Sequence, residues 1–142
     1  MDIRNIGVLM FAEHPEKFIP GSYIELIRFN TKEAEAYDDF IEKTFTGPIW
    51  KQVQDALDYI NTNVIEEKVV KLQGQAESER FFNYPYNALE EALVNAVFHK
   101  SYREQEPVEI RIYVDIFPKY YVNLRKMVLL DRNLIWMMTE HI

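Results

Sequence analysis

The segment at residues 107–117, PVEIRIYVDIF, alternates strictly between apolar and polar side chains. The apolar positions are Val108, Ile110, Ile112 and Val114. Because a strand places successive side chains on opposite faces of its sheet, this pattern is typical of a strand with one buried and one solvated face. A sheet of this kind needs another layer to cover its apolar face.

Two segments have the spacing of amphipathic helices that could supply this layer. The first opens at Gly47-Pro48, where proline suits the first helical turn. Its apolar residues recur every three or four positions: Ile49, Trp50, Val53, Leu57, Ile60 and Val64. The second spans residues 87–102, with Asn87 as the predicted N-cap. Its apolar face consists of Leu89, Ala92, Leu93, Ala96 and Val97.

The rest of the chain adds a short apolar helix at 5–12 and further strands. Strands are predicted at 22–30 and 119–125, and a hairpin at 68–74 and 77–85, joined around Gly74. The charged stretch 31–46 is predicted to be a surface loop, with room for a helical turn. The tail 127–142 is compatible with a docking helix or with a frayed end. This order predicts an α+β fold, with a mixed, mostly antiparallel sheet and helices packed on one face.

Composition and charge restrict the function classes. The 142 residues carry a net charge of −7, which argues against binding of a nucleic-acid backbone by this chain alone. The sequence has no cysteine, so disulfides and thiolate metal sites are excluded and a reducing compartment is expected. The apolar run 6–12 is too short to span a bilayer. We therefore expect a cytoplasmic protein with no membrane partner.

The second helical segment also carries a polar stripe of Glu91, Asn95, His99 and Tyr102 at helical spacing. Polar residues at a helix border are common, and a helix edge with a few hydrogen bonds is the simplest interpretation. The functional alternative uses Glu91 to accept a proton from an attacking water. The amide oxygen of Asn95, one turn further on, would then bind a hard cation such as Mg²⁺ that holds nucleotide phosphates.

Four stretches in this order resemble a known family: NIGVLMFAEHPEKFIPGSYIELIRF, GPIWKQVQDALDYI, YPYNALEEALVNAVFHKSY and VEIRIYVD. The chain resembles the C-terminal ATPase-like domain of RecG-related transcriptional regulators, which commonly carry an AlbA-type Schlafen domain ahead of it. The family hallmark, a helix reading E-A-(L/I)-V-N-A-x-x-H-(R/K)-x-Y after a Y-P break, matches residues 91–102. The resemblance covers residues 5–115.

The resemblance implies a partial GHKL-like (Bergerat) sandwich, related to gyrase B and the histidine kinases. It implies ATP and Mg²⁺ as cofactors, with Glu91 as the water-activating residue and Asn95 as the Mg²⁺ ligand. His99 and Tyr102 match the family's H-R-D-Y-like segment and are counted with the cofactor-binding residues. The alternative for these two is a structural tie between the helix end and the sheet.

The sequence departs from the family after residue 115. No D-x-G-x-G box is present, and no glycine follows Gly74, although backbone amides approach phosphates most closely at glycine. The helicase loop G-x-x-x-x-G-K-[ST] is also absent. We expect residues 1–142 to be one domain of a longer regulator, with 116–142 as a divergent tail. The predicted function is ATP and Mg²⁺ binding with little or no hydrolysis.

The alternative function is a non-catalytic dimerisation or interaction module of the same regulator. In both cases we expect a homo-oligomer, with nucleic acid bound through other domains of the full-length protein.

Overall fold

The computed structural model describes residues 3–29, 39–71, 73–74, 76, 78–82, 84–114, 125–131 and 134–139. The helices and strands follow one another in this order: α1 (Ile3–Phe11), the 3₁₀ turn η1 (Pro15–Lys17), β1 (Ile24–Phe29), β2 (Phe40–Phe45), α2 (Ile49–Asn63), β3 (Glu67–Lys71), β4 (Ser78–Phe82), α3 (Tyr86–Phe98), β5 (Val108–Val114), β6 (Arg125–Asp131) and β7 (Leu134–Thr139).

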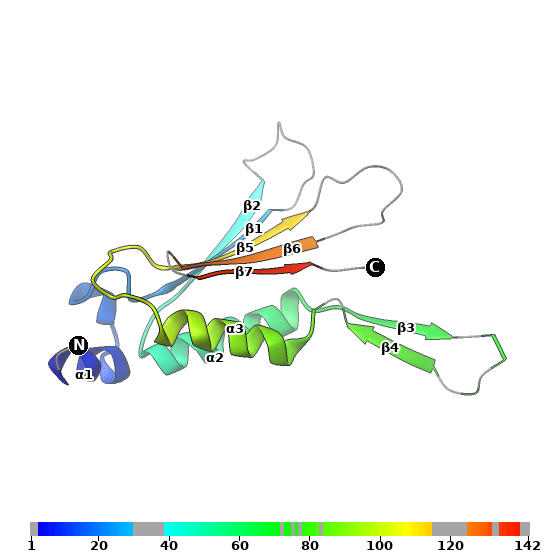
Figure 1. Cartoon of the computed structure of the whole chain (residues 1–142), viewed down its shortest axis with the longest axis horizontal. Coiled ribbons are helices and arrows are strands. Elements are labelled where there is room, and N and C mark those ends of the chain that lie inside the picture. The colour runs from blue at the N-terminus through cyan, green and yellow to red at the C-terminus, as the bar shows by residue number, and fades with distance from the viewer. Residues whose placement is uncertain are drawn as a thin grey trace.

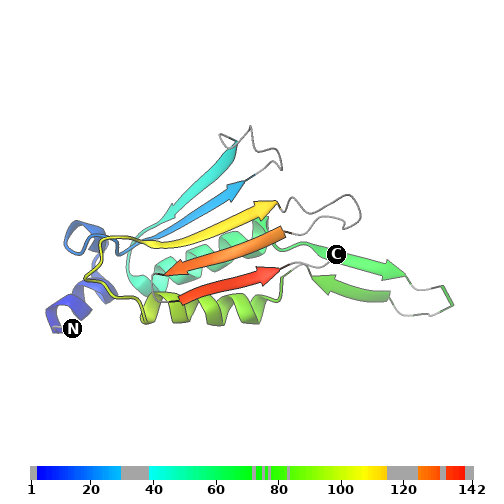
Figure 2. The ribbon, with the colours of Figure 1, turned by 45° about the horizontal axis from the view of Figure 1, so that its top comes forward.

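Five strands form the main sheet in the order β2-β1-β5-β6-β7 (Figure 2). The two central strands β1 and β5 are parallel, with Ile24 opposite Val108. The pairs β1–β2, β5–β6 and β6–β7 are antiparallel. The α+β class and the mixed, mostly antiparallel sheet are therefore confirmed.

Helices α2 and α3 lie side by side on one face of this sheet (Figures 1 and 2). The predicted apolar face of α3 is confirmed, since the same five residues from Leu89 to Val97 are buried. The alternation in β5 is also confirmed, because Val108, Ile110 and Ile112 are buried. The remaining core comes mainly from β1 and α2: Ile24, Leu26, Val53, Ala56, Leu57 and Ile60.

The predicted hairpin is present as β3 and β4, with Glu67 opposite Phe82 and Lys71 opposite Ser78. It forms a separate two-stranded sheet between α2 and α3 in the chain. In Figure 1 the hairpin extends away from the ends of both helices and from the main sheet. It is therefore attached to the rest of the described structure at its base.

Two segments of the main sheet differ from the sequence prediction. Within the predicted loop 31–46, residues 40–45 form the edge strand β2, because β1 offers an open hydrogen-bonding edge that satisfies their backbone groups. Residues 30–38 lie outside the described residues. In the tail, 125–131 and 134–139 form β6 and β7 instead of a helix or a frayed end, and β6 continues the sheet from β5. Of the strand predicted at 119–125, only Arg125 is described.

The turn before β1 packs closely against the loop that follows α3. Gly21 has φ of +80°, and a Cβ at this position would lie 2.6 Å from the backbone carbonyl carbon of Gln105. Only glycine combines this conformation with such a close approach. The turn therefore fixes the start of β1 against the segment that leads into β5. In the part of the chain that the structure describes, no helix is long and apolar enough to cross a membrane.

Candidate functional site at helix α3

The Y-P break ahead of α3 anchors the helix start. The side chain of Tyr84 is buried in the core, and Pro85 is the N-cap, whose carbonyl oxygen accepts the backbone N–H of Leu89 at 3.2 Å. The prediction that Asn87 is the N-cap was wrong. Proline disfavours the helical conformation in the residue that precedes it, so the helix starts at Pro85 and not further upstream. Asn87 lies exposed in the first turn.

Glu91 and Asn95 lie together on the side of α3 that does not enter the core. Glu91 is exposed, and Asn95 is half-buried at the border of the buried face. Residues four positions apart on a helix have Cβ atoms roughly 6 Å apart, so the carboxylate and the amide can reach the same small ligand. The structure thus keeps the two principal candidate residues adjacent and accessible from solvent.

The polar stripe does not continue as a helical row to Tyr102, because α3 ends at Phe98. His99 is the C-cap residue and is exposed. Tyr102 lies in the following turn, and its hydroxyl donates a hydrogen bond to the carbonyl oxygen of Val97 at 2.8 Å. The prediction of a helix up to residue 102 was therefore wrong. The hydroxyl of Tyr102 binds one of the terminal carbonyls that a helix leaves without an intrahelical partner.

The turn after α3 is held by a second interaction. The ammonium group of Lys100 donates to the carbonyl oxygen of Glu106 and lies 5.4 Å from the centre of the Tyr102 ring. Lys100 is almost fully buried, so these contacts replace the water that its charge loses. Tyr102 and Lys100 therefore tie the end of α3 to the segment that precedes β5, which agrees with the structural alternative for Tyr102.

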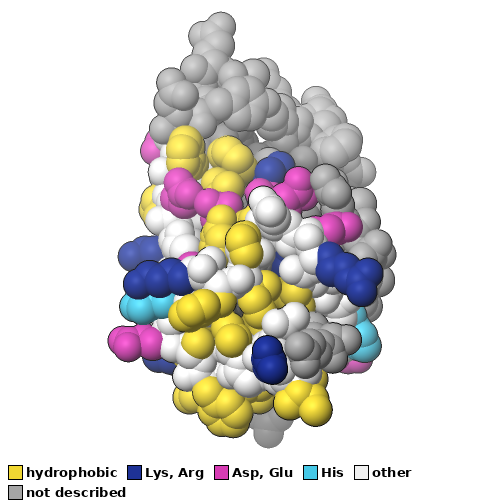
Figure 3. All heavy atoms as spheres, turned by 90° about the vertical axis from the view of Figure 1, so that its left-hand side faces the viewer, with side chains coloured by type: hydrophobic (Ala, Val, Ile, Leu, Met, Phe, Trp, Pro, Cys, Tyr) yellow, Lys and Arg dark blue, Asp and Glu magenta, His cyan; other side chains and the backbone are white. Residues whose placement is uncertain are grey.

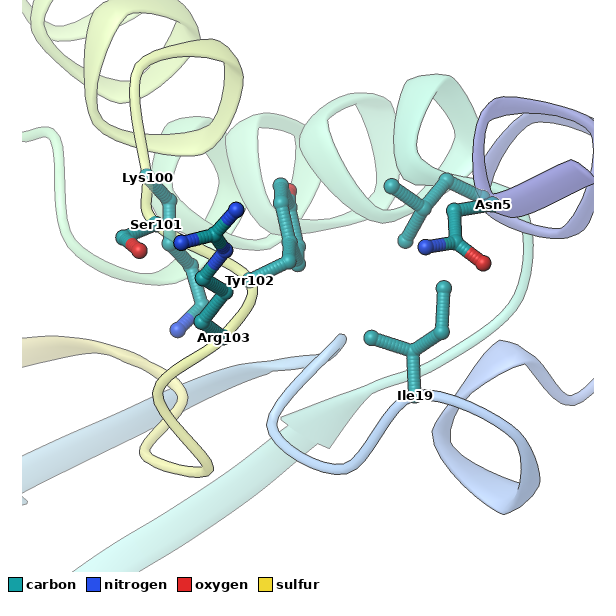
Figure 4. A pocket seen from close by; sticks show the side chains of 7 residues that line it. Asn5, Ile19, Lys100, Ser101, Tyr102 and Arg103 are labelled. Atoms are coloured by element: carbon teal, nitrogen blue, oxygen red, sulfur yellow. The ribbon is translucent and has the colours of Figure 1, made fainter. Parts of the chain in front are cut away.

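A cavity of about 450 Å³ lies beside this turn (Figure 4). In Figure 4 the side chains of Asn5 and Ile19 stand opposite the turn that carries Lys100 and Arg103. The residues that line the cavity come from three separate segments of the chain: Asn5, Leu9, Ile19, Lys100, Ser101, Tyr102 and Arg103. Tyr102 is the one predicted site residue in this lining. Sequence reasoning missed the others, since their positions along the chain have no common spacing.

The outer face of the sheet carries a group of carboxylates. Glu25 of β1 lies opposite Glu109 of β5, and Glu42 of β2 approaches from the other side. A hydrogen bond with the Glu42 carboxyl, partial burial, and the charges of Glu42 and Glu109 raise the pKa of Glu25 to about 7, against the opposing charge of Arg111. Arg111 pairs with Glu109 at 2.6 Å. Glu25 is therefore a group that titrates near neutral pH.

Among the described residues, no cluster of three or more His, Cys, Asp or Glu side chains is arranged to hold a metal ion. A cation at α3 would therefore depend on few protein oxygens and on oxygens of its own ligand. Comparison of the chain with protein families, with curated proteins and with solved structures gave no match.

Proposed function

We propose that this chain is the nucleotide-binding-type domain of a RecG-related, DNA-associated transcriptional regulator. It would bind ATP with Mg²⁺ along α3 and hydrolyse it slowly or not at all. The observation that carries the proposal is the pair Glu91 and Asn95, one helical turn apart on the solvent side of a helix whose other face is buried. The resemblance of the 91–102 segment to the family hallmark supports the same pair.

The donor atoms fit this ligand. Mg²⁺ prefers oxygen ligands and is commonly held by one or two protein groups, with the remaining positions taken by phosphates and water. The Asn95 amide offers one such oxygen from a half-buried position. When bound, the metal ion would neutralise charge on the phosphates. Glu91, one turn earlier, would orient a water molecule and accept its proton.

Slow hydrolysis follows from the composition of the chain. Phosphoryl transfer depends on many hydrogen-bond donors placed around the phosphates, and glycine lets backbone amides approach them. The sequence contains four glycines, and none follows Gly74. The proposed role is therefore the sensing of a nucleotide, with its effect passed to DNA through other domains of the regulator.

Thermal melting with and without millimolar ATP and Mg²⁺ tests this function, because a ligand that binds only the folded state raises the melting temperature. The intact chain should melt higher with ligand. Asn95→Ala should abolish the increase, and Asn87→Ala, an exposed amide on the same helix, should retain it. For hydrolysis, Glu91→Gln is compared with its exposed neighbour Glu90→Gln. An unchanged melting temperature at millimolar nucleotide would remove the nucleotide function.

A second function, that of an interaction module, is favoured by a different observation. Large apolar side chains are exposed at the end of the molecule that carries α1, where Ile3 and Phe11 are more than four-fifths exposed. Figure 3 shows apolar side chains gathered on this end. Val69 and Phe82 are exposed on the hairpin as well. Exposed apolar surface of this kind marks contacts with a partner.

Sedimentation equilibrium over a wide range of protein concentrations tests this second function. A reversible dimer would support a module that joins two copies of the regulator. A monomer at every concentration would contradict it, whatever the outcome of the nucleotide experiment.

A further inference from the structure

The hairpin β3–β4 is a two-stranded sheet that the described structure leaves outside the main sheet. A two-stranded hairpin without a covering layer is marginally stable in water, and its outer edges present unpaired backbone groups. Its stability would increase if another strand paired with one of these edges. The described residues of this chain supply no such strand.

The structure describes every side chain on one face of the hairpin. This face consists of three residues from each strand, all of them exposed: Glu67, Val69, Lys71, Ser78, Arg80 and Phe82. Val69 and Phe82 are each more than half exposed. Arg80 lies 3.3 Å from the Glu67 carboxylate, so an ion pair crosses the two strands near the base. This face therefore combines opposite charges with apolar side chains that remain in water.

We propose that the outer edge of β3 pairs antiparallel with β3 of a second copy of this chain. The two hairpins then form one four-stranded sheet around a two-fold axis at Val69. This inference rests on the interaction function proposed above and gives it a specific surface. It does not depend on nucleotide binding.

The two ends of β3, EKVVK, carry opposite charges at equal distances from Val69. With Val69 at the axis, Glu67 of each copy lies opposite Lys71 of the other, and all five residues are paired. Opposite charges at directly opposed positions stabilise an antiparallel pair, and the two valines meet at the centre. If the two-fold axis moves by one residue, to Lys68 or to Val70, Glu67 no longer lies opposite Lys71 and both charge pairs are lost. The charge pattern therefore selects one register.

Two other edges lack this complementarity. Pairing of β4 with itself around its central residue places Arg80 opposite Arg80. Pairing of the edge strand β2 with itself places either Glu42 opposite Glu42 or Lys43 opposite Lys43 at the axis. Like charges at directly opposed positions are destabilising. Of these three edges, β3 is the one whose charges favour a second copy.

The placement of the hairpin allows this pairing. Glu67 follows closely on α2 and lies at the base, and Lys71 lies towards the tip, which extends away from the helices (Figure 1). An antiparallel arrangement brings the base of one hairpin beside the tip of the other. The two main sheets then lie at opposite ends of the shared sheet. Because the charge pairs are exposed, the dimer should be weak and should dissociate at high salt.

A single introduced cysteine tests the axis, because the chain has no cysteine of its own. In Val69→Cys the two introduced thiols would lie directly opposite each other, within reach of a disulfide. Mild oxidation should give a covalent dimer in high yield. In the control Lys71→Cys the two thiols would be about 13 Å apart, four residues along the strands, and should cross-link far more slowly. Equal cross-linking of both variants would overturn the proposal.

Charge reversal tests the register. Glu67→Lys and Lys71→Glu each place like charges opposite each other, and each should weaken dimerisation about tenfold or more. Mixing these two variants should restore a dimer, because every opposed pair is then one positive and one negative charge. Glu67→Lys also breaks the ion pair between Glu67 and Arg80 within one hairpin. The control Arg80→Gln breaks the same ion pair without changing the charges opposed between the two copies, and this variant should still dimerise. A mixture that stays monomeric would overturn the register.

The outcomes separate this surface from the general function. If the parent chain dimerises but Val69→Cys does not cross-link, the interaction function stands on another surface and the β3 pairing is wrong. If the parent chain is monomeric at every concentration, both are wrong. Circular dichroism of each variant establishes that the fold is retained.

Discussion

The side-chain amide of Gln52 donates a hydrogen bond to the carbonyl oxygen of Ser22 at 2.7 Å, inside the core. The same nitrogen donates to the carbonyl oxygen of Gly47 at 2.7 Å. One buried amide thus joins helix α2 to the chain entering β1 and to the turn before α2. Buried carbonyls without a partner are costly, so this polar residue is suited to an otherwise apolar helix face.

Replacement of this amide should be strongly destabilising. Gln52→Leu removes the donor from two carbonyl oxygens, and we expect a loss of about 2–4 kcal/mol in the free energy of unfolding. Gln54→Leu, two positions away on the exposed side of α2, should change stability by less than about 0.5 kcal/mol. Urea denaturation followed by circular dichroism measures both values. Similar losses in the two variants would contradict the role assigned to Gln52.

Replacement of glycine by alanine should have opposite effects on the stability of the fold at Gly21 and at Gly7. Gly21→Ala places a Cβ against the Gln105 backbone at a positive φ, and we expect a cost on the order of 3 kcal/mol. At Gly7, inside α1, no heavy atom lies within 4 Å of the added Cβ. Gly7→Ala should therefore stabilise the helix by about 0.5–1 kcal/mol. Thermal denaturation of both variants checks the opposite signs, and a stable Gly21→Ala would contradict the close approach.

Glu25 should make stability depend on pH near neutrality. Its pKa is raised to about 7 in the folded protein, first by the hydrogen bond with Glu42, so the folded state holds a proton that the unfolded state releases. The contribution of Glu25 to the free energy of unfolding is fully present below the pKa that this carboxyl has in the unfolded chain. It is lost as pH rises through about 7, the pKa of Glu25 in the folded protein.

Melting temperatures at about pH 5 and about pH 8 test this linkage. The parent chain should lose more stability over this range than Glu25→Gln, which keeps a neutral side chain at the position. Glu90→Gln, an exposed carboxylate on α3, should behave like the parent. Identical pH profiles for the parent and Glu25→Gln would rule out the assignment.

The hydroxyl of Tyr102 should stabilise the end of α3. Tyr102→Phe removes the donor to the Val97 carbonyl oxygen while the ring remains, and we expect a loss of about 1 kcal/mol. Hydrogen exchange should become faster in the last turn of α3 and remain unchanged in β1. His99→Ala, at an exposed position, provides the comparison. If exchange at the end of α3 is the same in Tyr102→Phe and in the parent, the hydroxyl has no capping role.

Much of this fold follows from local patterns. The alternation at Val108, Ile110 and Ile112 and the apolar faces of α2 and α3 are periodic, and the structure buries most of the positions that these periods indicate. Trp50 is the exception: it was predicted to lie on the buried face of α2, but it is half exposed and its indole N–H donates to the carbonyl oxygen of Met10. Strand β2 could not be predicted in this way. All of its residues from Phe40 to Thr44 are exposed, so no side-chain period marks it, and its backbone is ordered by the open edge of β1.

The candidate site likewise has one part that the sequence predicts and one part that it does not. The relation between Glu91 and Asn95 depends only on helical spacing, and it was predictable. The end of α3 was not, because Phe98, His99 and Lys100 carry no glycine or proline to mark a stop. The contacts that define the end are made within the turn that follows the helix, from Tyr102 to Val97 and from Lys100 to Glu106, and no periodic pattern marks them. The lining of the cavity likewise depends on the packing of α1 near the turn after α3.

The parallel pairing of β1 with β5 also determines when the sheet can be completed during synthesis. β1 leaves the ribosome long before β5, and its buried residues Ile24 and Leu26 wait for α2, α3 and β5 to enclose them. Contacts between segments far apart in sequence form slowly, and an apolar strand with an open edge is prone to wrong pairing meanwhile. A nascent chain that ends before Val108 can pair β1 with β2 but leaves the other edge of β1 open, the kind of segment that chaperones protect.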